Sequence, residues 1–345
     1  MPPTGSPADP TAEHARHAAR DAGAEAWDRW GPYLSDRAWG TVREDYSPDG
    51  AVWGSFPPDH SRSRAYRWNE DGLGGVSDDR QYLCFAVALW NGEDPILKER
   101  LFGLTGPEGN HGESVKEEYW HTDATPSHSL LEFRYRYPQR RFPYERLIEQ
   151  SAARGLADPE PSLRDTGVFE GGRWFDVTVA YAKASPEDVL IEITVSNHGP
   201  EPASCHVLPT LWFRNTWSWG YPEGPMDDVP RRPEIRTGSA GELRAEHPIL
   251  GTYRLYDAAG ATPVFTENET NRQRLWGEPN PGPVKDAFGA WLIGGDDGAL
   301  GEGAGSKAAF VHRLDLGPGA SASIRLRLTA DSMVEPFEGF ETVFA

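Results

Sequence analysis

Apolar and polar residues alternate with a period of two in three separate segments, 174–181, 189–195 and 323–328. In the first segment every second residue is apolar, whereas Asp176 and Thr178 fall between them. The apolar set is Phe175, Val177, Val179 and Tyr181. This period is typical of strands that bury one face. Turn-forming residues at 186–188 and 197–200 come after the first two segments, so the pattern predicts neighbouring antiparallel strands.

A helical period appears only near the N-terminus and around residues 143–154. Alanines at positions 15, 19, 22 and 26 are three or four residues apart, and Thr11 precedes them as a helix N-cap. We expect this helix to run to about Trp30, because Gly31 and Pro32 would end it. Residues 1–10 contain four prolines and predict a disordered leader.

These patterns predict an all-β fold class, a large two-sheet antiparallel β-sandwich with an N-terminal helix and short helical insertions. The 30 prolines and 37 glycines favour many short strands over long helices. The expected organisation is a leader at 1–10, a helical segment at 11–34, the sandwich domain at 35–333 and the start of a linker at 334–345. Residues 222–246, rich in Pro, Gly and charge, predict a long irregular excursion.

The composition excludes several classes of partner and site. A formal net charge of −19 disfavours nucleic acid and anionic membrane surfaces. The two cysteines imply no disulfide framework, and the N-terminus has no apolar signal region, so a cytoplasmic location is expected. The ten histidines show no metal-ligand spacing, and no phosphate-binding glycine loop precedes a helix. We therefore expect no metal and no cofactor.

Tryptophan is concentrated in the first 90 residues of the chain, with six residues from Trp27 to Trp90 among paired acids and arginines. An indole ring stacks on the apolar face of a sugar ring, and charged or amide groups bond its hydroxyls. Any single tryptophan is more often a core residue than a ligand contact. The density of the set, and not one residue, therefore favours a carbohydrate-facing surface.

Four adjacent acid pairs are candidates for glycosidase chemistry, but none is sufficient. They are Glu44–Asp45, Glu70–Asp71, Glu117–Glu118 and Asp227–Asp228. Glycosidases need two carboxyl groups from separate segments across the scissile bond. Because adjacent residues of a strand point to opposite faces, each pair is interpreted as solvated or arginine-paired. His111 lies between Gly109 and Gly112. Glycines at these positions suit either close approach of the backbone to a ligand or a simple turn.

Several longer strings, in this order, resemble bacterial proteins of glycoside hydrolase family 63, the mannosyl-oligosaccharide glucosidase group. They include WGTVREDYSPDG at 39–50 and LPTLWFRNTWSW at 208–219. The remaining matches lie at 62–73, 89–92, 95–104, 108–113, 115–117, 266–271 and 285–288. The resemblance extends from about Trp27 to Leu328, nearly the whole chain.

The resemblance implies an N-terminal β-sandwich followed by an (α/α)6 barrel that supplies the general acid and the general base. The sandwich portion alone is matched here, so we expect a truncated protein whose chain is inactive by itself, and no catalytic residue is assigned. The implied function is that of the N-terminal domain of an inverting glycosidase acting on α-glucosides and oligosaccharides, with the missing barrel as its partner.

The residues expected at the rim of a sugar pocket are Trp68, Glu70, Asp71, Asn110, His111 and Glu113. One alternative is a stand-alone, non-catalytic carbohydrate-binding or structural module. Another is an enzyme whose acids lie wholly within the sandwich, which would require two carboxyl groups from different strands to face one pocket.

Overall fold

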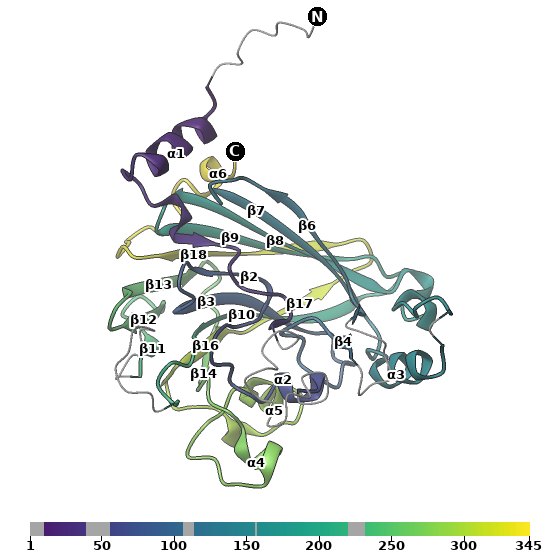
Figure 1. Cartoon of the computed structure of the whole chain (residues 1–345). Coiled ribbons are helices and arrows are strands. Elements are labelled where there is room, and N and C mark those ends of the chain that lie inside the picture. The colour runs from purple at the N-terminus through teal and green to yellow at the C-terminus, as the bar shows by residue number, and fades with distance from the viewer. Residues whose placement is uncertain (1–9, 39–55, 106–113, 156, 220–231) are drawn as a thin grey trace, which may run out of the picture.

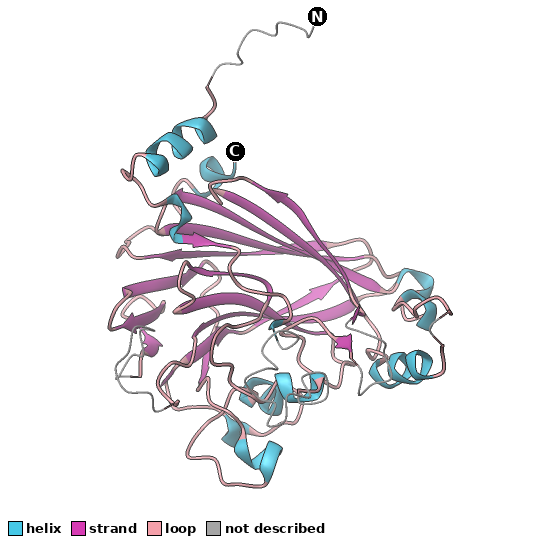
Figure 2. Ribbon diagram, viewed as in Figure 1, coloured by secondary structure: helices cyan, strands magenta, loops and turns pink. Residues whose placement is uncertain are grey.

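The protein consists of two large antiparallel sheets packed face to face, with short helices at the periphery (Figures 1 and 2). The computed structural model describes residues 10–38, 56–105, 114–155, 157–219 and 232–345. The predicted all-β sandwich is confirmed. In Figure 1 the strands β6, β7, β8, β9 and β18 of the larger sheet lie above the smaller sheet, and α1 and α6 lie above those strands.

The larger sheet has nine strands in the order β15-β11-β12-β13-β18-β9-β8-β7-β6. Its strands are β6 (Glu118–Ala124), β7 (Leu130–Pro138), β8 (Trp174–Ser185), β9 (Asp188–Asn197), β11 (Glu234–Thr237), β12 (Leu243–His247), β13 (Gly251–Asp257), β15 (Ala304–Gly305) and β18 (Ser321–Thr329). The three strands expected from alternation are β8, β9 and β18, and they are adjacent in the sheet.

The smaller sheet has the order β1-β2-β3-β10-β16-β14, with β17 also paired to β10. Its strands are β1 (Trp30–Gly31), β2 (Leu73–Asp78), β3 (Leu83–Trp90), β10 (Ala203–Phe213), β14 (Pro263–Thr266), β16 (Lys307–Phe310) and β17 (His312–Leu316). A separate pair joins β4 (Gly103–Leu104) to β5 (Ser114–Val115).

The main core fills the space between the two sheets. All four residues predicted to face inward from β8 are buried there, and Phe85 of β3 meets Tyr181 edge to face, with ring centroids 6.1 Å apart. Because side chains alternate along β3 as well, Phe85 and Val87 enter this core while Ala86 and Ala88 point away from it. The side of β3 away from the core is therefore free to take part in a second layer.

The helices are α1 (Ala12–Asp21), α2 (Pro58–Ser61), α3 (Tyr144–Ala152), α4 (Arg272–Trp276), α5 (Ala287–Leu292) and α6 (Phe340–Phe344). Short 3-10 turns are η1 (Trp27–Arg29), η6 (Arg164–Thr166), η7 (Glu170–Gly172) and η8 (Asp297–Ala299). The helix predicted around residues 143–154 is confirmed as α3.

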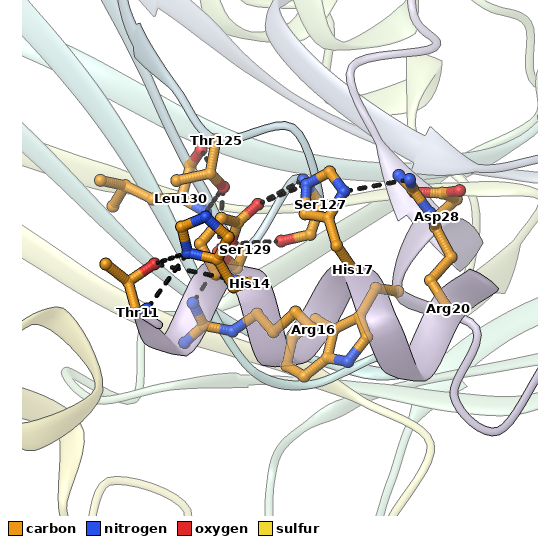
Figure 3. Close-up of polar contacts among 12 residues, drawn as sticks. Thr11, His14, Arg16, His17, Arg20, Asp28, Thr125, Ser127, Ser129 and Leu130 are labelled. Atoms are coloured by element: carbon orange, nitrogen blue, oxygen red, sulfur yellow. Dashed lines mark hydrogen bonds and ion pairs between the residues drawn. The ribbon is translucent and has the colours of Figure 1, made fainter. Parts of the chain in front are cut away.

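Helix α1 begins as predicted but ends earlier. Thr11 caps it through the backbone N–H of His14, and its C-terminal residue is Asp21 instead of Trp30. Gly23 lies just beyond it in the left-handed region at φ 66°, which stops the helix before the last alanine of the periodic set. Figure 3 shows the helix lying against Ser127 and Ser129, and the Glu13 carboxylate accepts hydrogen bonds from the Ser127 N–H at 2.7 Å and Oγ at 2.8 Å.

The expectation of an irregular excursion at 222–246 was wrong in its second half. Residues 232–246 contain β11 and most of β12, which pair with each other. Ile235, Leu243 and Ala245 are buried in the main core, so a short alternation among charged residues is enough to form edge strands. The first half, residues 222–231, lies outside the described residues.

The outer faces of the two sheets differ in how far other segments cover them. Residues 56–72, 95–102, 214–219 and 267–292, which include α2, α4 and α5, lie over the outer face of the smaller sheet and are called the covering layer (Figure 1). On α5, Phe288 packs against the outward residues Ala88 and Ala309 of that sheet. The outward residues of β6, β7, β8, β9 and β18 are called the open face, and α6 covers one end of it, where Phe340 packs on Arg325.

Candidate functional site

The centre of the smaller sheet carries small side chains on its outer face. Ala86 and Ala88 of β3 lie beside Thr210 of β10, and these strands are paired in register. Such residues leave space between the sheet and the covering layer. A cavity of about 20 Å³ occupies that space, lined by these three residues, by Trp212 and by charged side chains.

Six charged side chains gather around this cavity and are called the ion cluster. They are Glu70, Asp71, Glu99, Arg100, Lys285 and Lys307. Three are acids and three are bases, so their formal charges cancel when all are ionised. A buried charge is tolerated only when it is paired and hydrogen-bonded, and the contacts within the cluster meet that condition for most members.

Two acids of the ion cluster are held by cations. Arg100 Nε donates to Asp71 Oδ1 at 2.8 Å, and Lys307 Nζ donates to Glu99. Burial opposes the charge of Arg100, but Asp71 outweighs it and raises the pKa of Arg100. Burial likewise opposes the charge of Glu99, yet Lys307 and Arg100 together lower its pKa. Arg100 and Glu99 therefore remain ionised across the neutral range.

Glu70 and Lys285, the remaining acid and base of the ion cluster, interact electrostatically. Burial lowers the pKa of Lys285 to about 8, with Glu70 acting against that shift. Burial also raises the pKa of Glu70, and Lys285 opposes it. Lys285 Nζ donates to the Arg64 carbonyl at 2.9 Å and lies 3.7 Å from the centre of the Tyr66 ring. Both shifts favour the neutral forms of the pair.

The Glu70 carboxylate is also hydrogen-bonded by Asn268. Asn268 Nδ2 donates to Glu70 Oε1 at 2.7 Å and to the Phe213 carbonyl at 2.9 Å. Among the described residues, Glu70 Oε2 has no hydrogen-bond partner. A cavity of about 20 Å³ suits one water molecule and is far too small for a sugar ring. The ion cluster can therefore fix the covering layer in place, but it has no room to bind a substrate.

Segments far apart in the sequence meet at this cavity, and five of the strings that resemble family 63 each contribute lining residues. The contributions are Glu70 and Asp71 from 62–73, Glu99 and Arg100 from 95–104, Thr210 and Trp212 from 208–219, Asn268 from 266–271, and Lys285 from 285–288. The strings at 39–50 and 108–113 lie outside the described residues.

The predicted rim residues separate into three groups. Trp68 is 41% exposed, and the Arg67 guanidinium lies 4.0 Å from the centre of its ring. Glu70 and Asp71 are only 1% and 2% exposed, so they lie beneath the surface of the described structure, and their contact with a ligand stays a prediction. They lie beneath the surface because Arg100 and Lys285 compensate their charge. Asn110, His111 and Glu113 fall outside the part of the chain that the structure describes.

The interpretation of the acid pairs as solvated or arginine-paired holds for Glu118 and Asp71 but not for Glu117, whose partner is a lysine, or for Glu70. Glu118 opens β6 and bonds Arg136 at 2.9 Å on the open face, whereas the neighbouring Glu117 side chain is buried against Lys98. Glu70 and Asp71 instead precede β2, and both line the same cavity. The pairs at 44–45 and 227–228 lie outside the described residues.

Two features of the covering layer were missed from the sequence. Trp276 at the end of α4 is 51% exposed, and the Arg64 guanidinium lies 5.6 Å from its ring centre. Lys285 lies deep in the ion cluster, although sequence reasoning gave it no role. The string at 285–288 contained it, but only the folded chain brings it to Glu70.

A larger pocket, called the α2–α3 pocket, lies at the edge of the covering layer. Its volume is about 400 Å³, and its walls come from α2, from residues 95–102 and from α3. Asp59, Arg62 and Glu145 supply charged groups, while Ile96, Phe102 and Ile148 supply apolar walls. Burial would raise the pKa of Asp59, but Arg274 and Arg62 keep it below its usual value. Asp59 is thus a carboxylate at neutral pH and not a proton donor.

Neither a metal-binding cluster nor a membrane-spanning helix is found in the described residues. No group of three or more His, Cys, Asp or Glu side chains is arranged to hold a metal ion within those residues. No helix of the described parts is long and apolar enough to span a membrane.

Most of this chain is similar to part of a longer yeast protein. No family model matches the chain. The uncharacterized protein YMR196W of Saccharomyces cerevisiae is 37% identical over 358 residues, which cover 94% of this chain and 33% of the relative. The chain thus spans about a third of the length of the curated relative it matches.

Two solved structures show distant likeness to the chain. A putative aldose 1-epimerase from Escherichia coli K12 has 13% identity and a TM-score of 0.27, covering 61% of this chain and 68% of its own. The polysaccharide lyase BACCELL_00875 has 13% identity and a TM-score of 0.32, covering 78% of this chain and 28% of its own. At such scores neither likeness bears on function.

Proposed function

We propose that this chain forms a β-sandwich domain of a carbohydrate-active protein and that its covering layer is the functional face. More specifically, the chain is proposed to be the N-terminal domain of an inverting glycoside hydrolase that acts on α-glucosides or oligosaccharides. The observation that carries it is the meeting of five separate strings of the family 63 resemblance at one ion cluster. Because the ion cluster fixes the covering layer in place, these five segments together position the face to which the proposal assigns the function.

Two of the three exposed tryptophans of the described residues lie on the covering layer, which supports the same face. Trp68 and Trp276 both belong to the covering layer, and each has an arginine side chain over its ring. An indole beside a guanidinium offers a stacking surface and fixed hydrogen-bond donors, the combination that a sugar ring requires. Trp68 belongs to the set of six tryptophans between Trp27 and Trp90, and its contact with a sugar is part of this proposal.

The chemistry of hydrolysis is assigned to a separate domain. The ion cluster brings three carboxylates together, but its cavity has room for one water only. In the α2–α3 pocket, Asp59 is held ionised by two arginines and cannot protonate a leaving group. The length of the yeast relative, about three times the matched segment, supports the view that this sandwich is one part of a larger protein.

Activity measurements test this assignment. The 345-residue chain is expected to release no glucose from α-glucosides, while a longer chain that continues through the coding sequence beyond codon 345 is expected to do so with inversion. Turnover by residues 1–345 alone would place the acid and base inside the sandwich and refute the proposal. Inversion is checked by following the anomer of the released sugar by NMR.

A stand-alone carbohydrate-binding module is the second candidate, favoured by the exposure of Trp68 and Trp276 on a chain that folds around its own core. The two candidates differ in the coding sequence they require after codon 345. An in-frame helical region there supports the glycosidase domain, whereas an authentic stop codon supports the module.

A further inference from the structure

We propose that the α2–α3 pocket binds a single neutral sugar ring. This inference rests on the proposed function and adds a specific site to it, separate from the Trp68 surface. It depends on four properties of the pocket: its volume, its apolar walls, the pairing of its charges and the rigidity of its floor.

The volume fits a small ligand. About 400 Å³ lies within the range of pockets that bind small molecules, which begins at roughly 300 Å³. The walls belong to three segments, α2, residues 95–102 and the first turns of α3, so that a ligand would be enclosed from several sides. By contrast, the cavity at the ion cluster holds about 20 Å³.

The walls are mixed in a way that matches a pyranose. Ile96, Phe102 and Ile148 present apolar surface, and Asp59, Arg62 and Glu145 present hydrogen-bonding groups around it. A pyranose has an apolar C–H face and a rim of hydroxyls that both donate and accept. A carboxylate accepts and a guanidinium donates, so this set can bond hydroxyls in both senses.

The charges of the pocket are already paired, which selects a neutral ligand. Arg62 Nη2 lies 2.9 Å from Asp59 Oδ1, and Arg274 Nη2 lies 2.5 Å from Asp59 Oδ2. On the floor, Lys98 Nζ lies 2.7 Å from Glu117 Oε1. A phosphate or carboxylate ligand would have to compete with these carboxylates for the same cations.

The floor is preorganised. Besides Glu117, Lys98 Nζ donates to the Tyr144 hydroxyl at 3.0 Å and lies 3.8 Å from the centre of the Phe142 ring. Tyr144 in turn donates to Asp94 at 3.1 Å. Arg100, also on the floor, is fixed by Asp71 of the ion cluster. Binding therefore requires little ordering of these side chains, which favours affinity.

The experiment is a calorimetric or saturation-transfer titration of the 345-residue chain with glucose, methyl α-glucoside and maltose, and with glucose 6-phosphate as the charged comparison. Weak binding of the neutral sugars is expected. Ile148→Trp fills the pocket and should lower the affinity at least about tenfold. Arg62→Met removes a donor and should lower it by about fivefold or more. Melting curves check that both variants fold.

Two substitutions outside the pocket are the controls. Ile249→Trp adds the same bulk at the β12–β13 turn, where Ile249 is 53% exposed. Trp120→Ala removes an exposed indole from the open face. Both should keep the affinity within about twofold, since neither touches the pocket.

The outcomes separate the pocket from the wider proposal. Loss of binding in Ile148→Trp and Arg62→Met, with both controls unchanged, supports the site. Binding that survives both pocket variants but fails in Trp68→Ala overturns the pocket and leaves the proposed function intact. Absence of binding by any neutral sugar, or tighter binding of glucose 6-phosphate, also overturns the pocket, whereas hydrolysis by the longer chain is judged independently.

Discussion

The covering layer and the open face both carry many charged residues, but they hold them in opposite ways. Beneath the covering layer, Asp71 and Lys285 are buried and compensated within the ion cluster. On the open face, Arg134 pairs with Asp176 at 2.7 Å and Arg325 with Glu192 at 3.0 Å, with both arginines more than a third exposed. Buried pairs fix a structure because breaking them leaves an uncompensated charge, whereas water replaces a lost surface partner.

The two faces also differ in how they are built. On the open face, residues opposite each other on neighbouring strands pair directly, as Thr194 does with Ser323 at 2.7 Å and Ser196 with Ser321 at 2.7 Å. Such pairs result from strand register alone. The covering layer is made of loops and short helices, whose positions depend on contacts between distant segments. A surface specified by so many segments is the better candidate for a specific function.

The largest difference is expected for loss of a buried cation. Arg100→Met removes the cation that pairs with the buried Asp71 carboxylate and should reduce the free energy of unfolding by about 3–5 kcal/mol. Arg325→Met on the open face should cost about 1 kcal/mol or less. Chemical denaturation measures the free energy of unfolding of both variants. Equal losses would show that the buried ion pair stabilises the fold no more than the surface pair does.

Titration of Lys285 gives the next effect. Its pKa is about 8 in the folded chain and 10.5 when unperturbed, so between these values the unfolded state binds more protons. Stability should therefore rise with pH across this window, by up to roughly 3 kcal/mol from this group. Lys285→Met should lack that contribution, while Arg325→Met should retain it. Denaturation curves from about pH 7.5 to about pH 10.5 report the difference, and parallel curves for Lys285→Met and the unmodified chain would contradict the assigned shift.

Close packing against the smaller sheet gives a smaller effect. A Cβ on Gly72 would lie 2.5 Å from Ala86 Cβ and 2.9 Å from the Trp212 ring. Gly72→Ala should thus destabilise the protein by about 1–3 kcal/mol. At Gly317, beyond the end of β17, no atom lies within 4 Å of the added Cβ, so Gly317→Ala should change stability by less than about 1 kcal/mol. A tolerated Gly72→Ala would mean that the layer can shift outward.

Features that depend on neighbouring residues could be predicted from the sequence, whereas features that depend on distant segments could not. The strands β8, β9 and β18 could be identified because apolar and polar residues alternate along consecutive positions of each strand. The burial of Glu70 and Asp71 could not, because it depends on Arg100 and Lys285, which only the fold brings near. The early end of α1 was missed because the regular spacing of alanines predicted a longer helix, although Gly23 lies within that spacing. The exposure of Trp68 agrees with its surroundings of arginine and acid in the sequence.

The matched tryptophans provide the most direct measurement. Trp68 on the covering layer and Trp120 on the open face are 41% and 40% exposed, and each has an arginine over its ring. The measurement is kcat/KM for an α-glucoside in the longer chain that continues past codon 345. Trp68→Ala should lower kcat/KM by about tenfold, equivalent to about 1.4 kcal/mol, while Trp120→Ala should leave it within about twofold. A loss in Trp120→Ala with none in Trp68→Ala would place the functional surface on the opposite face of the sandwich.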